Sequence, residues 1–305
     1  MSLALTGGGT TTRIRFSDLS GAALWEGSGA GINPNSVPAD QRTERLLALV
    51  GEGLAAMGAA PREVAAGCLG VAGEDRPAEK AELETVLRQR LLLGCPLLVT
   101  TDADVALVGA HANPEGMILV CGTGSISIGR LADGTRVRAG GYGHFLSDEG
   151  SAFAIGFQAI CRSLRSMEGR DESTAMLAAL MERFSLSEPG LFVPMIYQRF
   201  DKAEIAACAG LVESFRAAAD PLAEAIYHDA VQGLSQLVTS VYRRIEVRMT
   251  RRALVFQGGL IENNAWLREN VTARLSVLHP DIEVRIPVES AAYGACMLAA
   301  GLAGS

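Results

Sequence analysis

Two segments of the chain match one another without a gap at an offset of 115 residues (residue 3 on residue 118), and this repeat constrains the fold more than any other feature. Leu3–Phe16 (LALTGGGTTTRIRF) aligns with Ile118–Leu131 (ILVCGTGSISIGRL). In each, an apolar strand is followed by a turn of Gly, Thr and Ser and by a second, alternating strand, which is the pattern of a β-hairpin. The repeat predicts two similar α/β domains.

Chain length and turn residues give the expected domain organisation. At roughly 100–200 residues per domain, 305 residues correspond to two domains. A polar turn at 113–116 precedes the second hairpin, so we expect an N-terminal domain over 1–112 and a C-terminal domain over 113–288, with a helical insertion at about 160–220. We expect the small residues of the C-terminal helix, 289–305, to pack back on the first domain.

Composition excludes several classes of partner. The formal net charge is −7, and no cluster of Lys and Arg is dense enough to neutralise a row of phosphates, which argues against nucleic acid and against an anionic membrane surface. No apolar run approaches the roughly 18–20 residues that span a bilayer, and the N-terminus reaches its glycines too early for a signal peptide. We therefore expect a soluble, cytoplasmic protein that binds small molecules.

Cysteine and lysine usage narrows the chemistry further. The six cysteines show no CxxC spacing, so zinc, disulfide-redox and iron–sulfur motifs are not indicated, and no metal chemistry beyond Mg²⁺ is expected. Lysine occurs only at 80 and 202, which rules out a P-loop. Any nucleotide phosphate must be held another way.

Three glycine turns are candidates for holding a nucleotide. Thr6–Thr10 (TGGGT) and Cys121–Ser125 (CGTGS) are the turns of the two repeated hairpins, and 256–260 (FQGGL) follows a later strand. Glycine permits left-handed backbone and close approach, so successive N–H groups can point at an anion. Two facing turns would grip the phosphates, and the third would suit an adenine or ribose. Each is also explained as an ordinary hairpin turn or strand-to-helix loop.

Asp102 and Asp148 are the candidate functional carboxylates. Asp102 follows a buried strand over 96–100, where open α/β sheets place their ligands, and a carboxylate there can accept a hydroxyl proton during phosphoryl transfer. The alternative is that Asp102 caps a helix over 103–110. Asp148 lies in a polar segment, before a helix expected to begin at the next residue, and is equally explained as its N-cap. The neighbouring His144 is better explained as a structural residue.

Together these motifs resemble those of the N-acetylglucosamine and glucosamine kinases, which belong to the BadF/BadG/BcrA/BcrD ATPase family within the sugar kinase, actin and Hsp70 superfamily. The match runs nearly end to end. Its most specific pieces are TTDAD at 100–104 and GGYGHFLSDEGSAFAIG at 140–156. The other matching motifs are GGGTTTR at 7–13, GCLGVAG at 67–73, ILVCGTGSISIG at 118–129 and FQGGL at 256–260.

The resemblance implies two ribonuclease-H-like domains of the actin-like ATPase type around a central cleft, with ATP and Mg²⁺ between the glycine turns and an amino sugar deeper inside. It implies phosphorylation of a 6-hydroxyl, with N-acetylglucosamine as the expected sugar and Asp102 as general base. Asn33 and Asp148 match sugar contacts. The remaining matched positions are Gly8, Gly9, Thr10, Gly122, Thr123 and Gly124 in the phosphate turns, with Gly122 and Thr123 also beside the substrate, and Gly258 and Gly259 in the adenosine loop.

One position departs from the family pattern, because Thr6 stands where the family has an acidic residue. That carboxylate helps to hold hydrated Mg²⁺ beside the β- and γ-phosphates, and a hydroxyl cannot replace its charge. A catalytically weakened sugar or nucleotide sensor is therefore an alternative. A kinase for glucosamine or N-acetylmuramic acid is another, since it shares all the motifs. A homodimer is suggested by analogy alone.

Overall fold

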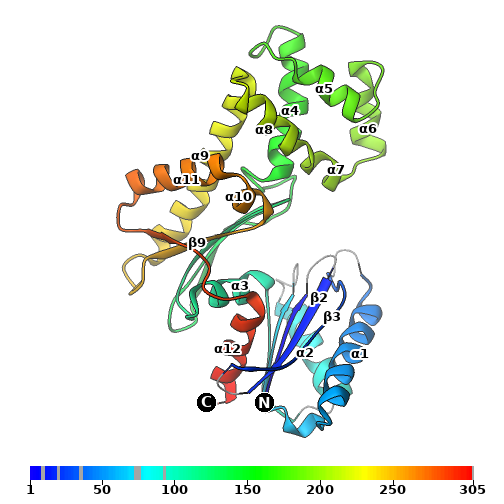
Figure 1. The fold of residues 1–305 in the computed structure, drawn as a ribbon, viewed down its shortest axis with the longest axis vertical. Coiled ribbons are helices and arrows are strands. Elements are labelled where there is room, and N and C mark those ends of the chain that lie inside the picture. The colour runs from blue at the N-terminus through cyan, green and yellow to red at the C-terminus, as the bar shows by residue number, and fades with distance from the viewer. Residues whose placement is uncertain (8–10, 19–20, 34–36, 72–76, 92–93, 304–305) are drawn as a thin grey trace. The chain divides into compact units, whose positions relative to one another are not determined.

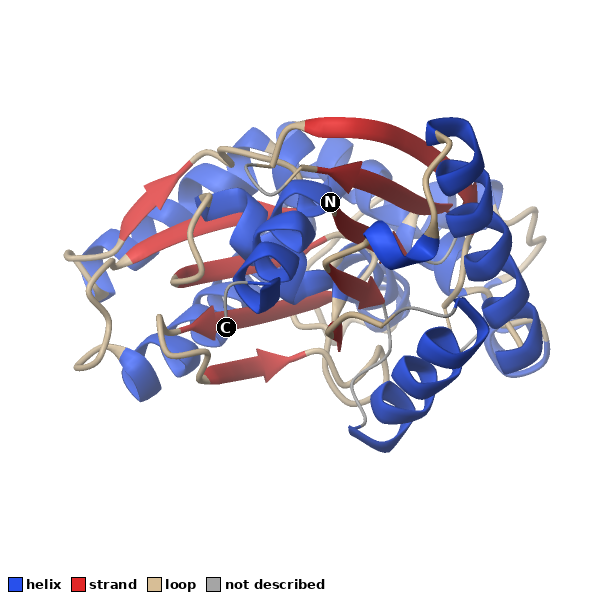
Figure 2. Cartoon of the chain, turned by 90° about the horizontal axis from the view of Figure 1, so that it is seen from below, coloured by secondary structure: helices blue, strands red, loops and turns tan. Residues whose placement is uncertain are grey.

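The computed structural model describes residues 1–7, 11–18, 21–33, 37–71, 77–91 and 94–303. The chain divides into two compact units (Figure 1): unit 1 is Met1–Gly116, Arg130–Thr135 and Ile286–Ser305, and unit 2 is Met117–Gly129 and Arg136–Arg285. Each unit contains one β-sheet and several helices, and Figure 2 shows the strands in red among the helices in blue. Within the described ranges, no helix is long and apolar enough to cross a membrane.

The sheet of unit 1 consists of β1 (Ser2–Gly7), β2 (Thr11–Ser17), β3 (Ala23–Ala30), β4 (Ala66–Val71) and β5 (Leu97–Thr100). Its strand order is β3-β2-β1-β4-β5. The first three strands form an antiparallel meander, and β4 and β5 add in parallel on the other side of β1. The carboxyl ends of β1, β4 and β5 therefore meet at one edge of the sheet, which is where the candidate residues of unit 1 lie.

Helices cover both faces of this sheet: α1 (Ala39–Met57), α2 (Pro77–Leu91), α3 (Asp102–His111) and α12 (Ala291–Ala303). Successive strand residues point to opposite faces, and β1 shows the consequence. Leu3 and Leu5 share a core with the buried leucines of α1, whereas Ala4 shares a separate core with Ala295 of α12.

Helices α3 and α12 pack backbone against backbone. A Cβ added at Gly109 would lie 2.0 Å from the Ser290 carbonyl oxygen, and one added at Gly294 would lie 2.1 Å from that of Val105. Only glycine leaves room for such an approach. The last helix of the chain thus completes the core that the first strand begins.

Unit 2 repeats the strand order of unit 1. Its strands are β6 (Gly116–Cys121), β7 (Ser125–Arg130), β8 (Arg136–Gly140), β9 (Ala253–Gln257) and β10 (Glu283–Arg285). The order β8-β7-β6-β9-β10 corresponds strand for strand to that of unit 1, and β9 lies parallel to both β6 and β10. The α/β fold with two similar halves, predicted from the hairpin repeat, is confirmed.

The two units differ in the connection that follows the third strand. In unit 1, β3 is joined to β4 through α1 and the short 3₁₀ helix at Pro61–Glu63. In unit 2 the connection from β8 to β9 contains a long series of helices, and two more follow β9. They are α4 (Ala152–Met167), α5 (Met176–Arg183), α6 (Phe192–Gln198), α7 (Lys202–Ala206), α8 (Cys208–Ala217), α9 (Pro221–Ile245), α10 (Gly259–Asn263) and α11 (Ala265–Leu278).

Candidate active site

The two carboxylates of the TTDAD segment have different environments. Thr101 is the N-cap of α3, and its hydroxyl accepts a hydrogen bond from the Asp104 N–H at 3.2 Å. The buried Asp104 carboxylate accepts in turn from the hydroxyls of both preceding threonines, at 2.6 and 2.8 Å. Asp102 is the first helical residue, is exposed, and accepts the Ala103 N–H at 2.9 Å. The interpretation of Asp102 as the cap is therefore wrong, since Thr101 and Asp104 form the capping box.

Thr6 lies at the carboxyl end of β1, half-buried, directly opposite Arg13 of β2. Both line a cavity of about 410 Å³ with Ser28 of β3 and the first residues of α12. At the position where the family pattern has a carboxylate, the lining of this cavity therefore has the hydroxyl of Thr6 beside the exposed guanidinium of Arg13. The following turn residues Gly8, Gly9 and Thr10 lie outside the described residues.

Asn33 follows β3 in unit 1. It is half-buried, and its backbone carbonyl accepts the Val37 N–H at 2.9 Å. Its expected role as a sugar contact stays a prediction.

The second glycine turn is fastened to α4. The Gly122 N–H donates to the Gly124 carbonyl at 2.9 Å, and the carbonyls of Gly122 and Thr123 accept the first two helical N–H groups of α4, at 2.9 and 3.3 Å. Ser151 is the N-cap and accepts the next N–H at 3.2 Å. The helix donors that would otherwise lack partners thus hold the turn in place.

Asp148 lies against this turn, and each of its carboxylate oxygens accepts a hydrogen bond. It is only 4% exposed, its Oδ1 accepts the Ser125 N–H at 3.1 Å, and its Oδ2 accepts from Lys202 Nζ at 3.0 Å. A Cβ added at Gly124 would lie 2.8 Å from Oδ1, so glycine is required there. The expectation of a helix beginning at Glu149, with Asp148 as its N-cap, is wrong: α4 begins three residues later behind Ser151.

The third glycine turn lies beside the second, within unit 2. Gly258 has a left-handed backbone with φ = 104°, and a Cβ there would lie 2.6 Å from the Cys121 carbonyl oxygen. Its N–H donates to Glu262 Oε1 at 3.0 Å. Gly122 is also close, because a Cβ added to it would lie 3.7 Å from the Gly259 nitrogen. Parallel pairing of β6 with β9 is what brings together turns that are more than a hundred residues apart.

These two turns form one wall of a cavity of about 450 Å³ in unit 2. Gly122, Thr123 and Gly259 contribute backbone, and Leu260 contributes an apolar side chain. The lining from α7, α8 and the residue between them consists only of small residues: Ala203, Ala206, Ala207, Ala209 and Gly210. Small walls let a flat base approach the backbone closely, and backbone N–H groups suit phosphate oxygens. The residues present therefore fit the adenosine and phosphates of ATP.

Magnesium in phosphoryl-transfer enzymes is usually bound by one or two protein carboxylates together with phosphate oxygens and water. Among the described residues there is no group of three or more His, Cys, Asp and Glu that could form a metal site. This agrees with the coordination that Mg²⁺ prefers in phosphoryl-transfer enzymes, in which phosphate oxygens and water supply most ligands and the protein supplies one or two.

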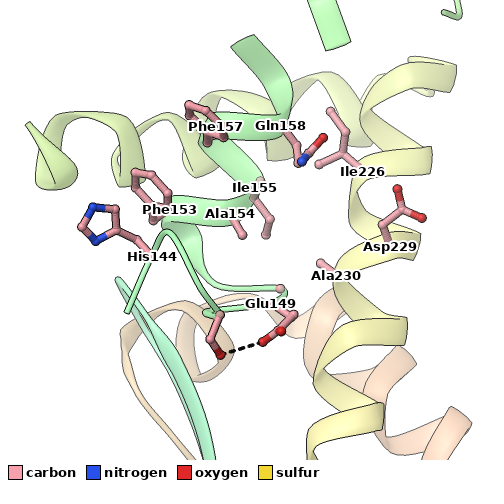
Figure 3. A pocket seen from close by; sticks show the side chains of 12 residues that line it. His144, Glu149, Phe153, Ala154, Ile155, Phe157, Gln158, Ile226, Asp229 and Ala230 are labelled. Atoms are coloured by element: carbon pink, nitrogen blue, oxygen red, sulfur yellow. Dashed lines mark hydrogen bonds between the residues drawn. The ribbon is translucent and has the colours of Figure 1, made fainter. Parts of the chain in front are cut away.

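His144 belongs to an aromatic cluster. Its ring stacks on Phe200 at 5.1 Å and meets the edge of Phe153 at 5.0 Å, and burial and then the charge of Lys202 lower its pKa. This packing supports a structural role. His144 also lies at the margin of a second cavity of about 440 Å³, which Figure 3 shows between α4 and α9 with Glu149 below.

Sequence reasoning missed the contribution of the helical insertion to the site. Lys202 and the small residues at 203–210 lie on α7 and α8 or between them. The helical periodicity of this segment predicts that one face is buried, but it does not predict which other element of the protein packs against that face. Two signals were present. Lysine occurs at only two positions of the chain, and the run AEIAACAG at 203–210 is unusually rich in small side chains.

Comparison with known proteins gives a consistent result over the whole chain. The family model for the BadF/BadG/BcrA/BcrD ATPase family matches residues 5–299. An N-acetylmuramic acid/N-acetylglucosamine kinase from Clostridium acetobutylicum is 30% identical over 298 residues, which cover 97% of each chain. An N-acetyl-D-glucosamine kinase from Dictyostelium discoideum is 27% identical over 244 residues, covering 78% of this chain and 76% of that protein.

Solved structures show the same fold. A protein from Chromobacterium violaceum that carries an N-acetylglucosamine kinase assignment has a TM-score of 0.73 at 24% identity, covering 97% of this chain and 98% of that one. A ROK hexokinase from Thermus thermophilus has a TM-score of 0.61 at 16% identity, covering 98% and 97%. The expected fold of two ribonuclease-H-like halves, as in actin-like ATPases, is confirmed.

Proposed function

The chain belongs to the BadF/BadG/BcrA/BcrD ATPase family, and from that membership we propose that it is an ATP-dependent kinase that phosphorylates an amino sugar, N-acetylglucosamine, at its 6-hydroxyl. The observation that carries the proposal is the environment of Asp102. Its carboxylate is exposed at the carboxyl end of β5, while the neighbouring Asp104 performs the capping. An exposed carboxylate at the carboxyl end of a parallel strand lies where open α/β sheets bind their ligands.

Asp102 acts as the general base. As the 6-hydroxyl oxygen attacks the γ-phosphorus, its proton passes to the Asp102 carboxylate, the new O–P bond forms, and the bond to the β,γ-bridging oxygen breaks to release ADP. Asn33 and Asp148 hold the sugar through its polar substituents. Both roles are proposed from the family resemblance together with the placement of these residues in loops after β3 and before α4.

The cavity lined by Gly122, Thr123 and Gly259 takes the nucleotide. The small residues that line it leave room for adenosine. The N–H groups of Thr123, Gly124 and Gly259 would bind the phosphates, because those of Gly122 and Gly258 already donate to the Gly124 carbonyl and to Glu262. Gly8, Gly9 and Thr10 are proposed as their counterparts in unit 1. Mg²⁺, when bound, neutralises charge on the transferring phosphoryl group. Thr6 offers that ion's hydration shell a hydroxyl in place of a charge.

The test is ADP release with Mg²⁺ and ATP in the presence of N-acetylglucosamine, glucosamine, N-acetylmuramic acid or glucose, with a no-sugar control. We expect turnover that depends on N-acetylglucosamine, a product phosphorylated at oxygen 6 by NMR, and none with the 6-deoxy sugar.

Silence with every sugar, from protein shown to be folded, would contradict the kinase proposal. The presence of Thr6 makes a sensor the second candidate in that case. Calorimetric binding of sugar or nucleotide without turnover would identify it.

A further inference from the structure

The cavity proposed for the nucleotide has almost no polar side chains in its lining. Besides the two glycine turns and the small residues at 203–210, the lining includes Ala152 of α4 and Leu260 of α10. Among the described residues that line it, only Thr123 has a polar side chain. Thr123 belongs to the second glycine turn, at the end of the cavity that we assign to the phosphates. The rest of the lining has no side chain that could form a hydrogen bond with the edge of a base.

Backbone carbonyls of the same lining already accept hydrogen bonds from the protein. The Ala203 carbonyl accepts the Ala207 N–H at 2.9 Å. The Gly210 carbonyl accepts the Ser214 hydroxyl at 3.1 Å. This part of the lining therefore limits the size of a base and offers little that would recognise its polar groups.

Three exposed positions of the insertion share one helical face toward this cavity. Ala203, Ala207 and Gly210 all line it and are exposed, whereas Ala206 and Ala209 are buried. Ala207 lies between α7 and α8 with helical backbone (φ −64°, ψ −16°), so the two helices follow one path. Positions three and four residues apart then lie on the same side. The exposure of this face also leaves water in contact with the cavity.

Gly210 has no side chain for a reason that the packing of unit 2 does not supply. A Cβ added there would have no heavy atom within 4 Å apart from its chain neighbours and the backbone of its own helix. Gly156 of α4 is different, because a Cβ there would lie 2.0 Å from the Ile205 carbonyl oxygen. Glycine in a helix also costs stability relative to other residues. What a side chain at Gly210 would occupy is space in or beside the nucleotide cavity.

We propose that the phosphoryl-donor site separates purine from pyrimidine nucleotides by size but does not separate one purine from another, and that Gly210 leaves the room that a purine requires. The inference rests on the proposed function, in particular on the nucleotide lying in this cavity. The reaction is the same with each donor: the γ-phosphoryl group passes to the sugar hydroxyl, and the corresponding nucleoside diphosphate leaves.

The chemistry of the bases sets the expected selectivity. A site built around hydrogen bonds to one substrate rejects an analogue that lacks them by about 10⁴- to 10⁵-fold. Adenine, guanine and hypoxanthine share the same two fused rings and differ only in groups at the edge, which can remain hydrated where the cavity is open to water. A pyrimidine has one ring and buries less apolar surface against Leu260 and the alanines.

The first experiment uses the wild-type protein with N-acetylglucosamine as acceptor. ATP, GTP, ITP and UTP are compared as Mg²⁺ complexes, and the sugar phosphate is measured directly so that the identity of the diphosphate does not affect the assay. We expect kcat/KM for the three purine nucleotides to agree within about tenfold and to exceed that for UTP by at least about tenfold.

A larger preference for ATP over GTP or ITP would overturn the inference and leave the kinase intact, and so would equal use of UTP. No turnover with any of the four donors and any amino sugar, from folded protein, would instead overturn the proposed function.

The second experiment fills the space in front of Gly210. Gly210→Leu is expected to raise KM for ATP and GTP at least about tenfold and KM for UTP less, while KM for N-acetylglucosamine changes by less than about twofold. Gly210→Ala should lie between this variant and the wild type. The Tm of both variants should equal or exceed that of the wild type, because each replaces a helical glycine where there is open space.

Gly51→Leu is the matched control. It makes the same substitution at an exposed glycine of α1 in unit 1, also with open space around it, and should change neither nucleotide selectivity nor KM.

Three results with Gly210→Leu would contradict the assignment. An unchanged KM for ATP would mean that the base lies elsewhere. An equal loss for ATP and UTP would mean that the side chain does not act through the size of the base. A lower Tm would mean that the fold itself requires glycine at this position.

Discussion

Strands β1 and β6 occupy the same place in sheets of the same strand order, yet the surroundings of their carboxyl ends differ. In unit 1, Thr6 near the end of β1 lies opposite Arg13 and beside a cavity that is also lined by the first residues of α12. In unit 2, the turn after β6 is bonded to α4, abuts the buried Asp148 and, through it, reaches Lys202 of α7. The difference comes from the insertion between β8 and β9. The comparison shows that two sheets of the same strand order place the same backbone at the carboxyl end of the first strand. The helices added in unit 2 determine which side chains surround that backbone.

The largest expected effect comes from replacing Asp102, the proposed general base, which lies in unit 1. Asp102→Asn should reduce kcat by about 10²- to 10⁴-fold, the usual contribution of a general base, while ATP binding in unit 2 stays nearly intact. Asp104→Asn is the matched variant, since it removes a buried capping carboxylate. It should lower the free energy of unfolding by about 1–2 kcal/mol and leave turnover per folded molecule within about threefold. Normal turnover in Asp102→Asn would refute the assignment of the base.

The next test introduces a side chain into the third glycine turn, beside the proposed nucleotide cavity of unit 2. Gly258→Ala places a Cβ 2.6 Å from the Cys121 carbonyl oxygen at a left-handed position. We expect a loss of about 1–3 kcal/mol in unfolding free energy and about a tenfold rise in KM for ATP, with a smaller effect on the sugar. Gly51→Ala, on α1 with open space around it, should cost nothing. A variant of Gly258 with unaltered ATP affinity would show that this turn lies away from the nucleotide.

A third test gives the first turn the charge that the family pattern has there. Thr6→Asp should increase kcat/KM for Mg·ATP about tenfold, because a carboxylate stabilises the hydrated ion where a hydroxyl cannot. Thr6→Asn has the same size without the charge and should show no gain. If both variants behave alike, or if the new carboxylate pairs with Arg13 and activity falls, charge at this position is not what limits the enzyme.

The smallest effect concerns an ion pair that exists only because unit 2 has the insertion. Arg162 of α4 donates to both oxygens of Asp171 at 2.9 Å, and this hydrogen bonding holds the Asp171 pKa down to about 2. A depressed carboxyl pKa adds stability above the ordinary value, and that stability is lost as pH falls toward 2. Asp171→Asn should lower the unfolding free energy by about 1 kcal/mol at pH 7. Urea unfolding between pH 7 and pH 3 should show the difference shrinking, and a constant difference would disprove its ionic origin.

The fold followed from the sequence because its main signal is local and occurs twice. The matched hairpins at 3–16 and 118–131 contain their own turn residues, and the strand order of both units grows from them. Asp102 could be predicted to lie at the carboxyl end of a strand for the same reason, since its position after a buried strand is a local property; its role as the base stays a prediction.

The small-residue wall and Lys202 could not be predicted in this way. They lie about 80 residues beyond the second glycine turn, and what brings them to it is the packing of α7 and α8 against α4 rather than any pattern within the segment. The sequence also could not predict which of Asp102 and Asp104 takes part in the N-terminal capping of α3. Both positions are close enough to the start of the helix for a capping carboxylate. Hydrogen-bond geometry decided it.

The close packing of α12 on α3 has a consequence for how the protein is made. Unit 1 is discontinuous, and the core that contains Ala4 and Cys68 is completed by Ala295 and Cys296, which are synthesised after all of unit 2. Unit 2, apart from its hairpin, is a single stretch and is synthesised before that core can close. The whole sequence of unit 2 is therefore available for folding before the sequence of unit 1 is complete. A nascent chain that stalls before α12 leaves one apolar face of the unit 1 sheet uncovered, and chaperones would have to shield it.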